Sequence, residues 1–225
     1  AMYIGDTGEN GLHELVKEIV NNSVDEAMAG RCSRIDVTIT EQGTVHIKDD
    51  GHGIPTDFHA GENKSGVEVV MTMLHAGGKF DKKAYQVSGG LHGVGASVVN
   101  ALSEWCTVEV WQKGKVHLQK FARGIPETGL DIIGDTEETG TIIEFKPDAE
   151  IFESVIFSFD YIAYRLRELA FLTKGLGINV RDARSGEEAQ YLYEGGVEEF
   201  VRFLNEGRSV LHPDPIYLQG ERDGV

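Results

Sequence analysis

Cysteine is scarce in this sequence, and the positions of its two cysteines exclude whole classes of site. In a chain of 225 residues, only Cys32 and Cys106 carry a thiol. They lie too far apart in the chain to form a metal-binding knuckle or a redox pair. Two isolated thiols are typical of proteins from reducing compartments, so we expect a cytoplasmic protein.

Long hydrophobic runs are also missing, although hydrophobic residues make up 40% of the chain. No stretch approaches the roughly 18 consecutive apolar residues that a membrane span requires. The N-terminus lacks the succession of basic, apolar and small residues that marks a signal peptide. We therefore expect one large globular domain, or one domain and the start of another, with no membrane partner.

Basic residues are few, because 21 Lys and Arg stand against 37 Asp and Glu, for a net charge of −16. Affinity for nucleic acids comes largely from Lys and Arg side chains that displace counterions from phosphates. This chain alone is therefore expected to be a poor DNA-binding module. Nucleotides are not excluded, since backbone amides and Mg²⁺ can hold their phosphates.

Hydrophobic periodicity predicts helices and hairpins in alternation. Helices are predicted over residues 11–29, 67–75, 96–102, 160–173 and 198–204. Strands are predicted over residues 34–40, 44–48, 105–112, 115–122, 141–145, 178–182 and 216–219. Helices at the start, middle and end with hairpins between them indicate an α+β layered sandwich and not a regular βαβ array.

The first predicted helix carries polar side chains along one face. At about 100° per residue this face contains Glu14, Glu18, Asn21, Asn22, Asp25 and Glu26. Glu14 and Glu18 repel each other one turn apart. The macrodipole disfavours anions such as Asp25 and Glu26 near the C-terminal end of a helix. These unfavourable placements favour a functional site, while a merely solvated face remains the alternative from spacing alone.

Two side chains on that face have the chemistry for hydrolysis. A carboxylate at Glu18 could polarise a water molecule, and the side-chain oxygen of Asn22 could hold Mg²⁺. The run from His13 to Lys17 does not match the zinc-protease pattern, because that pattern requires His where Lys17 stands. We therefore reject zinc proteolysis.

A glycine-rich turn at residues 49–55 follows the second predicted strand. Its ordinary interpretation is a turn after an edge strand. Its functional interpretation is a carboxylate, Asp49, at the end of a strand beside glycines that let a flat ring approach the backbone. Asp49 would accept a hydrogen bond from an exocyclic amine, which favours adenine over guanine. A buried Asp49 would then obtain its partner from the ligand.

Two glycine-dense runs, residues 77–80 and 88–95, lead toward the helix predicted at residue 96. A flexible linker is the alternative interpretation. Glycines at a helix N-terminus expose amide donors to a phosphate, so a nucleotide lid is favoured. The sequence contains no P-loop, and the runs do not match the dinucleotide-binding fingerprint.

In this order, the motifs closely resemble the ATPase domains of bacterial type II topoisomerases, gyrase B and its paralogue topoisomerase IV. The matching segments are residues 2–5, 18–27, 49–55, 74–80, 88–95 and 139–141. The resemblance covers essentially the whole chain. It implies the superfamily that also includes Hsp90 chaperones, histidine kinases and MutL. The implied fold is of the Bergerat type, a two-layer α/β sandwich whose mixed, mostly antiparallel sheet carries helices on one face.

The resemblance also implies roles for particular residues. Glu18 is expected to be the general base that activates water, and Asn22 the Mg²⁺ ligand. Asp49 is expected to recognise the adenine amine, with help from Thr141 through a water. The other expected ATP contacts are Asp25, Glu26, Gly53, Ile54, Pro55, Gly77, Gly78, Lys79, Tyr85, Leu91, His92, Gly93, Val94 and Gly95.

Three positions depart from the family pattern. Glu14 stands where relatives usually carry a His that orients the catalytic Glu, and the adjacent His13 points about 100° away. His52 stands where an Arg is expected to pair with Glu26, and His52 could do so only when protonated. Gln112 replaces an Arg that coumarin drugs use in relatives, so coumarin affinity is expected to be lower.

The resemblance places the ATPase domain at residues 1–215 and the start of the following transducer domain at 216–225. A dimer-swapping arm would precede Ala1, and a domain whose Lys reaches the γ-phosphate would follow Val225. The chain alone is therefore expected to bind ATP as a monomer and to hydrolyse it slowly or not at all.

In the full protein, ATP-driven dimerisation is expected to power DNA strand passage and supercoiling. The implied partners are a second gyrase B chain, gyrase A chains, double-stranded DNA and coumarin-type inhibitors. Gyrase B is favoured over topoisomerase IV, although the motifs hardly separate them. A nucleotide-gated clamp related to mismatch-repair or chaperone proteins is a further alternative, and the matches at residues 74–80 and 88–95 weigh against it.

Overall fold

The computed structural model describes residues 3–74, 95–212 and 214–218. Its helices are α1 (Glu9–Met28), α2 (Gly66–Thr72), α3 (Gly95–Ala101), α4 (Phe159–Leu172) and α5 (Gly196–Leu204). Its strands are β1 (Arg34–Ile39), β2 (Val45–Asp49), β3 (Phe58–His59), β4 (Lys64–Ser65), β5 (Ser103–Gln112), β6 (Lys115–Ala122), β7 (Ile125–Pro126), β8 (Asp131–Asp135), β9 (Gly140–Pro147), β10 (Gly177–Asp182) and β11 (Glu188–Tyr191). Each predicted helix lies on one of these elements, as does each predicted strand up to residue 182.

The described strands form one large sheet of nine strands and a separate two-stranded sheet, β3–β4. The order along the large sheet is β11-β10-β1-β2-β9-β5-β6-β7, and β8 also pairs with β6. The pairing of β1 with β10 is parallel, and the other pairings are antiparallel. The expected mixed, mostly antiparallel sheet is therefore confirmed, as are the two predicted hairpins, β1–β2 and β5–β6.

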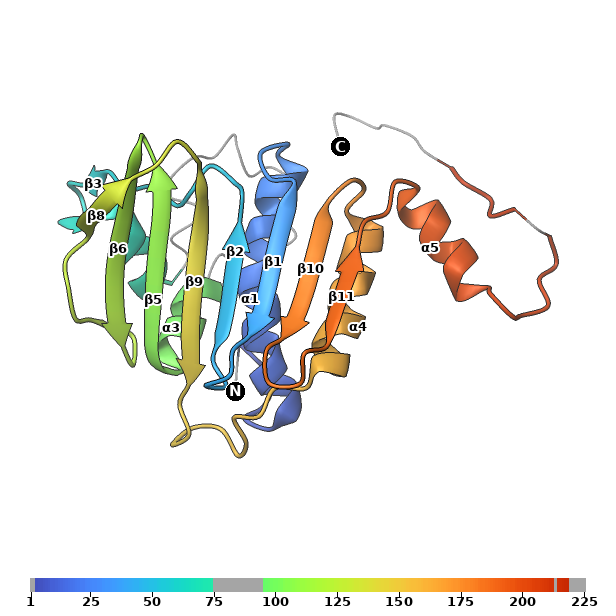
Figure 1. Ribbon diagram of the computed structural model, residues 1–225, viewed down its shortest axis with the longest axis horizontal. Coiled ribbons are helices and arrows are strands. Elements are labelled where there is room, and N and C mark those ends of the chain that lie inside the picture. The colour runs from blue at the N-terminus through green and yellow to red at the C-terminus, as the bar shows by residue number, and fades with distance from the viewer. Residues whose placement is uncertain (1–2, 75–94, 213, 219–225) are drawn as a thin grey trace.

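Helices α1, α3 and α4 lie together on one face of the sheet (Figure 1). Strand β2 shows why: Val45, Ile47 and Asp49 alternate with less buried residues and turn to the same side. A single register therefore buries the hydrophobic residues of β2 and turns Asp49 toward the helices. The two-layer arrangement predicted for the fold is confirmed.

The long helices are amphipathic and not uniformly hydrophobic. Helix α1 buries Leu12, Leu15 and Ile19, each at most 2% exposed, against the sheet. Glu18 and Asn22 on its other side are half-buried and exposed, respectively. In the described ranges, no helix combines the length and hydrophobicity that crossing a membrane requires.

The strand predicted at residues 216–219 is wrong over its described part, because residues 216–218 form no regular structure. Conversely, the edge strand β8 had no signal in the hydrophobic pattern, and the short strand β11 was also not predicted, although its four residues alternate between exposed and half-buried. Ile132 and Ile133 of β8 are 61% and 54% exposed. An edge strand that buries little shows no alternation of apolar and polar residues, so periodicity does not reveal it.

Candidate functional site

The polar face of α1 brings three predicted residues into one line. Glu18, Asn22 and Glu26 follow one another at intervals of one turn. A rise of 1.5 Å per residue separates Glu18 from Glu26 by roughly 12 Å along the axis. A ligand bound along this face can therefore meet one group at Glu18 and a different one near Glu26. Asp25 lies half-buried beside Glu26.

Asp49 ends β2 beside the same helix and is 8% exposed. Its Oδ2 accepts a hydrogen bond from the Ser23 hydroxyl at 2.7 Å. Its Oδ1 accepts hydrogen bonds from the backbone N–H groups of Gly51 at 2.9 Å and Thr141 at 3.2 Å. The expectation that a ligand supplies the partner of Asp49 is therefore wrong in part, because the chain itself supplies three donors.

Burial raises the pKa of the Asp49 carboxyl above its ordinary value. The hydrogen bonds from Ser23, Gly51 and Thr141 act in the opposite direction, because they stabilise the charged form. The nearby carboxylate of Glu26 adds to the upward shift. A carboxylate that costs free energy to bury and has donors arranged around it is typical of a recognition site.

The turn after Asp49 is fixed by side chains from neighbouring strands. The N–H of Ile54 donates to the Thr141 hydroxyl at 3.3 Å. The Gln112 side chain donates to the His52 carbonyl at 3.1 Å and accepts from the Thr56 hydroxyl at 3.1 Å. Gly53, Ile54 and Pro55, all predicted contacts, are half-buried in this turn. Gln112 thus holds the turn from its outer side.

Gly140 allows β9 to approach the end of β2 closely. Its φ is +151°, and a Cβ there would lie 2.2 Å from the carbonyl oxygen of Asp49. Asp49 pairs with Thr141 in the sheet register. The absence of a side chain at position 140 therefore helps bring Thr141 beside the Asp49 carboxylate.

Glu18 lies against the first residue of α3. A Cβ added to Gly95 would lie 2.3 Å from Glu18 Oε2. Gly95, predicted as the last residue of the lid, is therefore required for the position of the Glu18 carboxylate. The other predicted contacts of the lid lie outside the described residues; they are Gly77, Gly78, Lys79, Tyr85, Leu91, His92, Gly93 and Val94.

Asn22 is the candidate Mg²⁺ ligand and is exposed one turn from Glu18. Among the described residues, no group of three or more His, Cys, Asp and Glu side chains is placed to hold a metal ion. Mg²⁺ commonly keeps several waters and takes few protein ligands beside substrate phosphates. A single amide oxygen facing solvent fits that way of binding.

The departure at Glu14, with the adjacent His13, has structural consequences around Glu18. Repulsion between Glu14 and Glu18 was expected, but the structure offsets it, because the Lys17 ammonium pairs with the Glu14 carboxylate at 2.7 Å. His13 is 2% exposed and accepts a hydrogen bond from the Ser158 N–H at 2.8 Å through Nε2. His13 therefore links α1 to the start of α4 and does not orient Glu18.

Glu26 pairs with Arg31, where the sequence analysis considered His52 as its partner. The Arg31 guanidinium lies 3.2 Å from the Glu26 carboxylate, and the Arg31 N–H donates to the Glu26 carbonyl at 2.9 Å. His52 is exposed. Because an arginine keeps its charge at all ordinary pH values, this ion pair does not require a protonated histidine.

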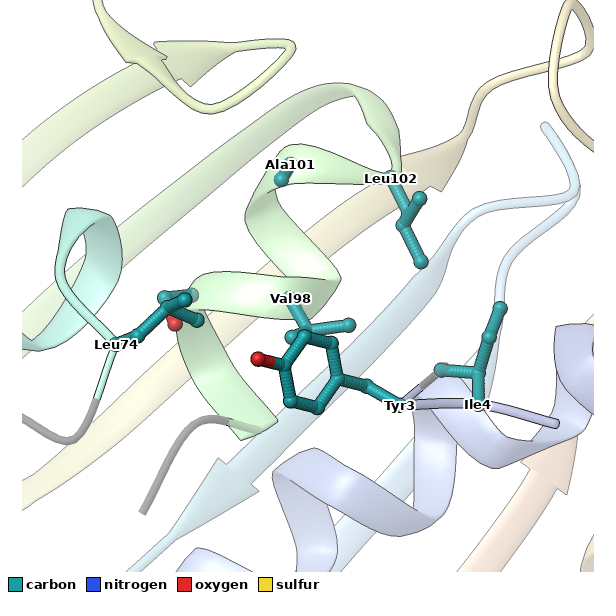
Figure 2. A pocket seen from close by; sticks show the side chains of 7 residues that line it. Tyr3, Ile4, Leu74, Val98, Ala101 and Leu102 are labelled. Atoms are coloured by element: carbon teal, nitrogen blue, oxygen red, sulfur yellow. The ribbon is translucent and has the colours of Figure 1, made fainter. Parts of the chain in front are cut away.

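A pocket of about 210 Å³ lies along α3, where Ser97, Val98 and Ala101 contribute to its lining. Figure 2 shows Tyr3 and Leu74 beside Val98 of α3. The residues that line the pocket are Tyr3, Ile4, Leu74, Ser97, Val98, Ala101 and Leu102. Its lining is mostly apolar and contains no charged side chain, and it shares no residue with the site around Asp49.

Sequence reasoning missed Ser23 and Arg31. Ser23 was assigned no role from the sequence, yet its 2% exposure places it on the buried side of α1. A polar residue among the helix's hydrophobic positions was the signal that could have identified it, since buried polar groups require partners. Arg31 lies beyond the end of α1 at Met28 and carried no periodic signal.

Comparison with known proteins identifies one family. A family model described as histidine kinase-, DNA gyrase B- and HSP90-like ATPase matches residues 7–151. That range contains Glu18, Asn22, Asp49 and Thr141.

Several relatives match over nearly the full chain. The DNA gyrase B protein of Halalkalibacterium halodurans is 55% identical and matches 100% of the chain and 36% of its own length. The DNA gyrase B protein of Thermotoga maritima is 52% identical and matches 97% of the chain and 34% of its own length. The type 2 topoisomerase B protein of Aquifex aeolicus is 52% identical, with 100% and 28% covered. The chain thus spans about a third of the length of these relatives.

A solved structure is similar as well. It is the 43K ATPase domain of Thermus thermophilus gyrase B in complex with an aminocoumarin. The identity is 43% and the TM-score 0.86, over 99% of this chain and 57% of that one.

Proposed function

The chain belongs to the family of histidine kinase-, DNA gyrase B- and HSP90-like ATPases, and we propose that it is the ATP-binding and ATP-hydrolysing domain of a DNA gyrase B protein. The proposal rests on one arrangement: the buried Asp49 carboxylate lies beside α1, whose polar face carries Asn22 and Glu18. Base recognition and hydrolytic chemistry then lie at two ends of one face.

Within this proposal each residue has a definite task. Asp49 accepts a hydrogen bond from the adenine amine, and Thr141 supports that contact. Glu18 accepts a proton from the attacking water, and Asn22 holds Mg²⁺, which supplies positive charge to the phosphates when bound. Catalysis of this kind depends mostly on positioning and on charge stabilisation.

The larger protein is proposed to be a cytoplasmic type II topoisomerase. Residues 1–215 form its ATPase domain, and 216–225 begin the next domain. Its partners are a second gyrase B chain, gyrase A chains and double-stranded DNA, and ATP-driven dimerisation powers strand passage. Aminocoumarins bind weakly, because Gln112 provides no guanidinium and holds the turn at His52 through its amide.

The first experiment measures binding of a non-hydrolysable ATP analogue with Mg²⁺ by calorimetry, in parallel with the GTP analogue. The adenine nucleotide is expected to bind and the guanine nucleotide to bind much more weakly. Asp49→Asn removes a hydrogen bond to a charged group, worth about 1.5–3 kcal/mol, so binding weakens roughly tenfold to hundredfold.

The neighbouring Asp50→Asn is the matched control. Asp50 is exposed and accepts hydrogen bonds from the backbone of Ser33 and Arg34, away from Asp49. It should leave adenine preference unchanged. A folded wild-type chain that bound no adenine nucleotide, or an Asp49→Asn variant with unchanged selectivity, would contradict the proposed role of Asp49.

Turnover is measured separately. The chain alone is expected to hydrolyse ATP slowly or not at all, and Glu18→Gln should abolish any turnover while leaving nucleotide binding intact. A rate equal to that of an intact gyrase would show that no flanking domain contributes to catalysis.

A further inference from the structure

The hydrogen bonds of Asp49 divide its two oxygens unequally. A carboxylate has about four lone-pair positions. Oδ1 accepts from two backbone N–H groups, of Gly51 and Thr141. Oδ2 accepts from the Ser23 hydroxyl. Among the described residues three positions are thus filled, and the remaining acceptor position is on Oδ2, the oxygen that Ser23 holds.

We propose that Ser23 is a positioning residue for base recognition, which presents Oδ2 of Asp49 to the ligand amine and keeps the carboxylate an acceptor. This inference rests on the proposed function, because it assigns Ser23 to the site that recognises the base. Ser23 does not touch the reacting atoms.

The placement of the Ser23 hydroxyl supports this role. A serine within a helix commonly bonds the carbonyl of the preceding turn. Ser23 instead donates its single proton across the layer boundary, from α1 to the end of β2, at 2.7 Å. Both groups are buried, with Ser23 2% and Asp49 8% exposed, so water competes little for this bond.

The surrounding charges make this donor important. Within the described part of the chain, the titratable groups that face Asp49 are Glu26 from α1, with Arg31 as its partner, and Cys32 after α1. From β9 the facing residue is Thr141, which is uncharged. Burial and Glu26 raise the pKa of Asp49, and the Ser23 hydrogen bond is the largest opposing contribution.

Loss of the Ser23 hydroxyl should therefore raise the pKa of Asp49 further. A protonated carboxyl donates at one oxygen and accepts less well, so it no longer matches an amine donor. Removal of Ser23 should accordingly shift the loss of adenine binding to higher pH.

The test compares Ser23→Ala with wild type by calorimetry of the ATP analogue with Mg²⁺ at a series of pH values. At neutral pH the variant should bind roughly threefold to tenfold more weakly, and its acid-side loss of affinity should begin at higher pH. Ser23→Thr keeps the hydroxyl and should restore the wild-type profile. Ser103→Ala removes another buried hydroxyl, which donates to the Val99 carbonyl at 2.7 Å, and should leave the profile unchanged.

A chemical double-mutant cycle gives a second readout. The same analogue with unsubstituted purine as its base lacks the exocyclic amine. Loss of the amine should weaken binding strongly in wild type and much less in Ser23→Ala, because the two groups act through one carboxylate. Additive losses, together with an unshifted pH profile, would overturn the role of Ser23 while wild-type adenine binding upholds the proposed function. Absence of adenine binding in wild type would overturn both.

Discussion

At the scale of single residues, recognition and stability make opposite demands on Asp49. Its carboxylate lies in a buried place where ionisation is unfavourable, and burial raises its pKa. As pH rises from the ordinary value of 3.8 through that raised pKa, the unfolded state releases its proton first. The free energy of unfolding therefore falls across this interval and stays lowered at neutral pH.

Asp49→Asn is consequently expected to stabilise the fold at neutral pH while it weakens nucleotide binding. Asparagine can keep the hydrogen bonds from Gly51 and Thr141 and donate to Ser23 without ionising. Urea unfolding at neutral pH and near pH 4 measures the free energy of unfolding of both proteins. The stabilisation by Asp49→Asn should be smaller at the lower pH.

Asp182→Asn is the control of opposite sign. The Arg184 hydrogen bond lowers the pKa of Asp182, and the two side chains pair at 2.6 Å. Removal of that charge should destabilise the fold at neutral pH. If both substitutions changed the free energy of unfolding in the same direction, the electrostatic account of Asp49 would be contradicted.

Substitution of Gly95 is expected to impair hydrolysis more than nucleotide binding. In Gly95→Ala the new methyl group meets Glu18 Oε2 at 2.3 Å, so the carboxylate must move. Misplacement of a catalytic group by about 1 Å can reduce the rate by roughly a hundredfold. Phosphate release from ATP, measured in the full-length protein, should fall accordingly, while ADP affinity should fall less, because Gly95→Ala keeps the backbone N–H through which residue 95 is expected to contact the nucleotide. Gly129→Ala, which has open space around its Cβ, should change neither quantity.

At the scale of elements, α1 performs two tasks on opposite sides. Its inner side packs on the sheet, and its outer side carries Glu18 and Asn22. His13 adds a third connection, because its Nδ1 bonds the Glu9 carbonyl at 2.7 Å and its Nε2 accepts from Ser158. Ser158 is also the N-cap of α4, so one imidazole joins the two helices.

This connection should weaken in mild acid. Nε2 must remain unprotonated to accept from Ser158, and burial lowers the pKa of His13 below 6.5. As pH falls from 6.5 through the lowered pKa, the unfolded state takes up the proton first, so the free energy of unfolding falls. His13→Gln should cost about 1 kcal/mol at neutral pH and remove part of this acid sensitivity. Urea unfolding of wild type and His13→Gln at about pH 7.5 and 5.5 measures both effects. If the free energy of unfolding of the variant depended on pH as it does in wild type, the proposed role of His13 would be contradicted.

At the scale of the whole molecule, the net charge of −16 acts on both stability and partners. Like charges on one surface repel in the compact state, and salt screens that repulsion. The free energy of unfolding should therefore rise when salt is raised from about 50 to 500 mM.

The same charge should prevent appreciable binding of this chain alone to duplex DNA at about 50 mM salt. Fluorescence anisotropy of a labelled duplex measures this directly. Tight binding that decreased steeply with salt would show a basic surface that the overall charge conceals. DNA contacts of the proposed gyrase would then include this domain and not only other parts of the assembly.

Much of the fold was accessible from periodicity and motif order, because these depend on near neighbours in the chain. The repeat of hydrophobic residues every three to four positions located α1, and alternation located β1 and β2. Glu18 and Asn22 were chosen because acidic residues occurred in unfavourable places along one helix face, and Asp49 because a carboxylate ended a strand beside glycines. Strand β8 was not accessible, since its pattern is set by a single neighbouring strand and by solvent.

The partners of those candidates depended on contacts between residues distant in the sequence. Ser23 meets Asp49 across 26 positions, and Thr141 meets it across 92. No local pattern could pair Arg31 with Glu26 or turn His13 toward Ser158, since side-chain direction is fixed only when the layers pack. The sequence could therefore name the chemistry of the site, while packing selected which neighbours hold each charge and how strongly.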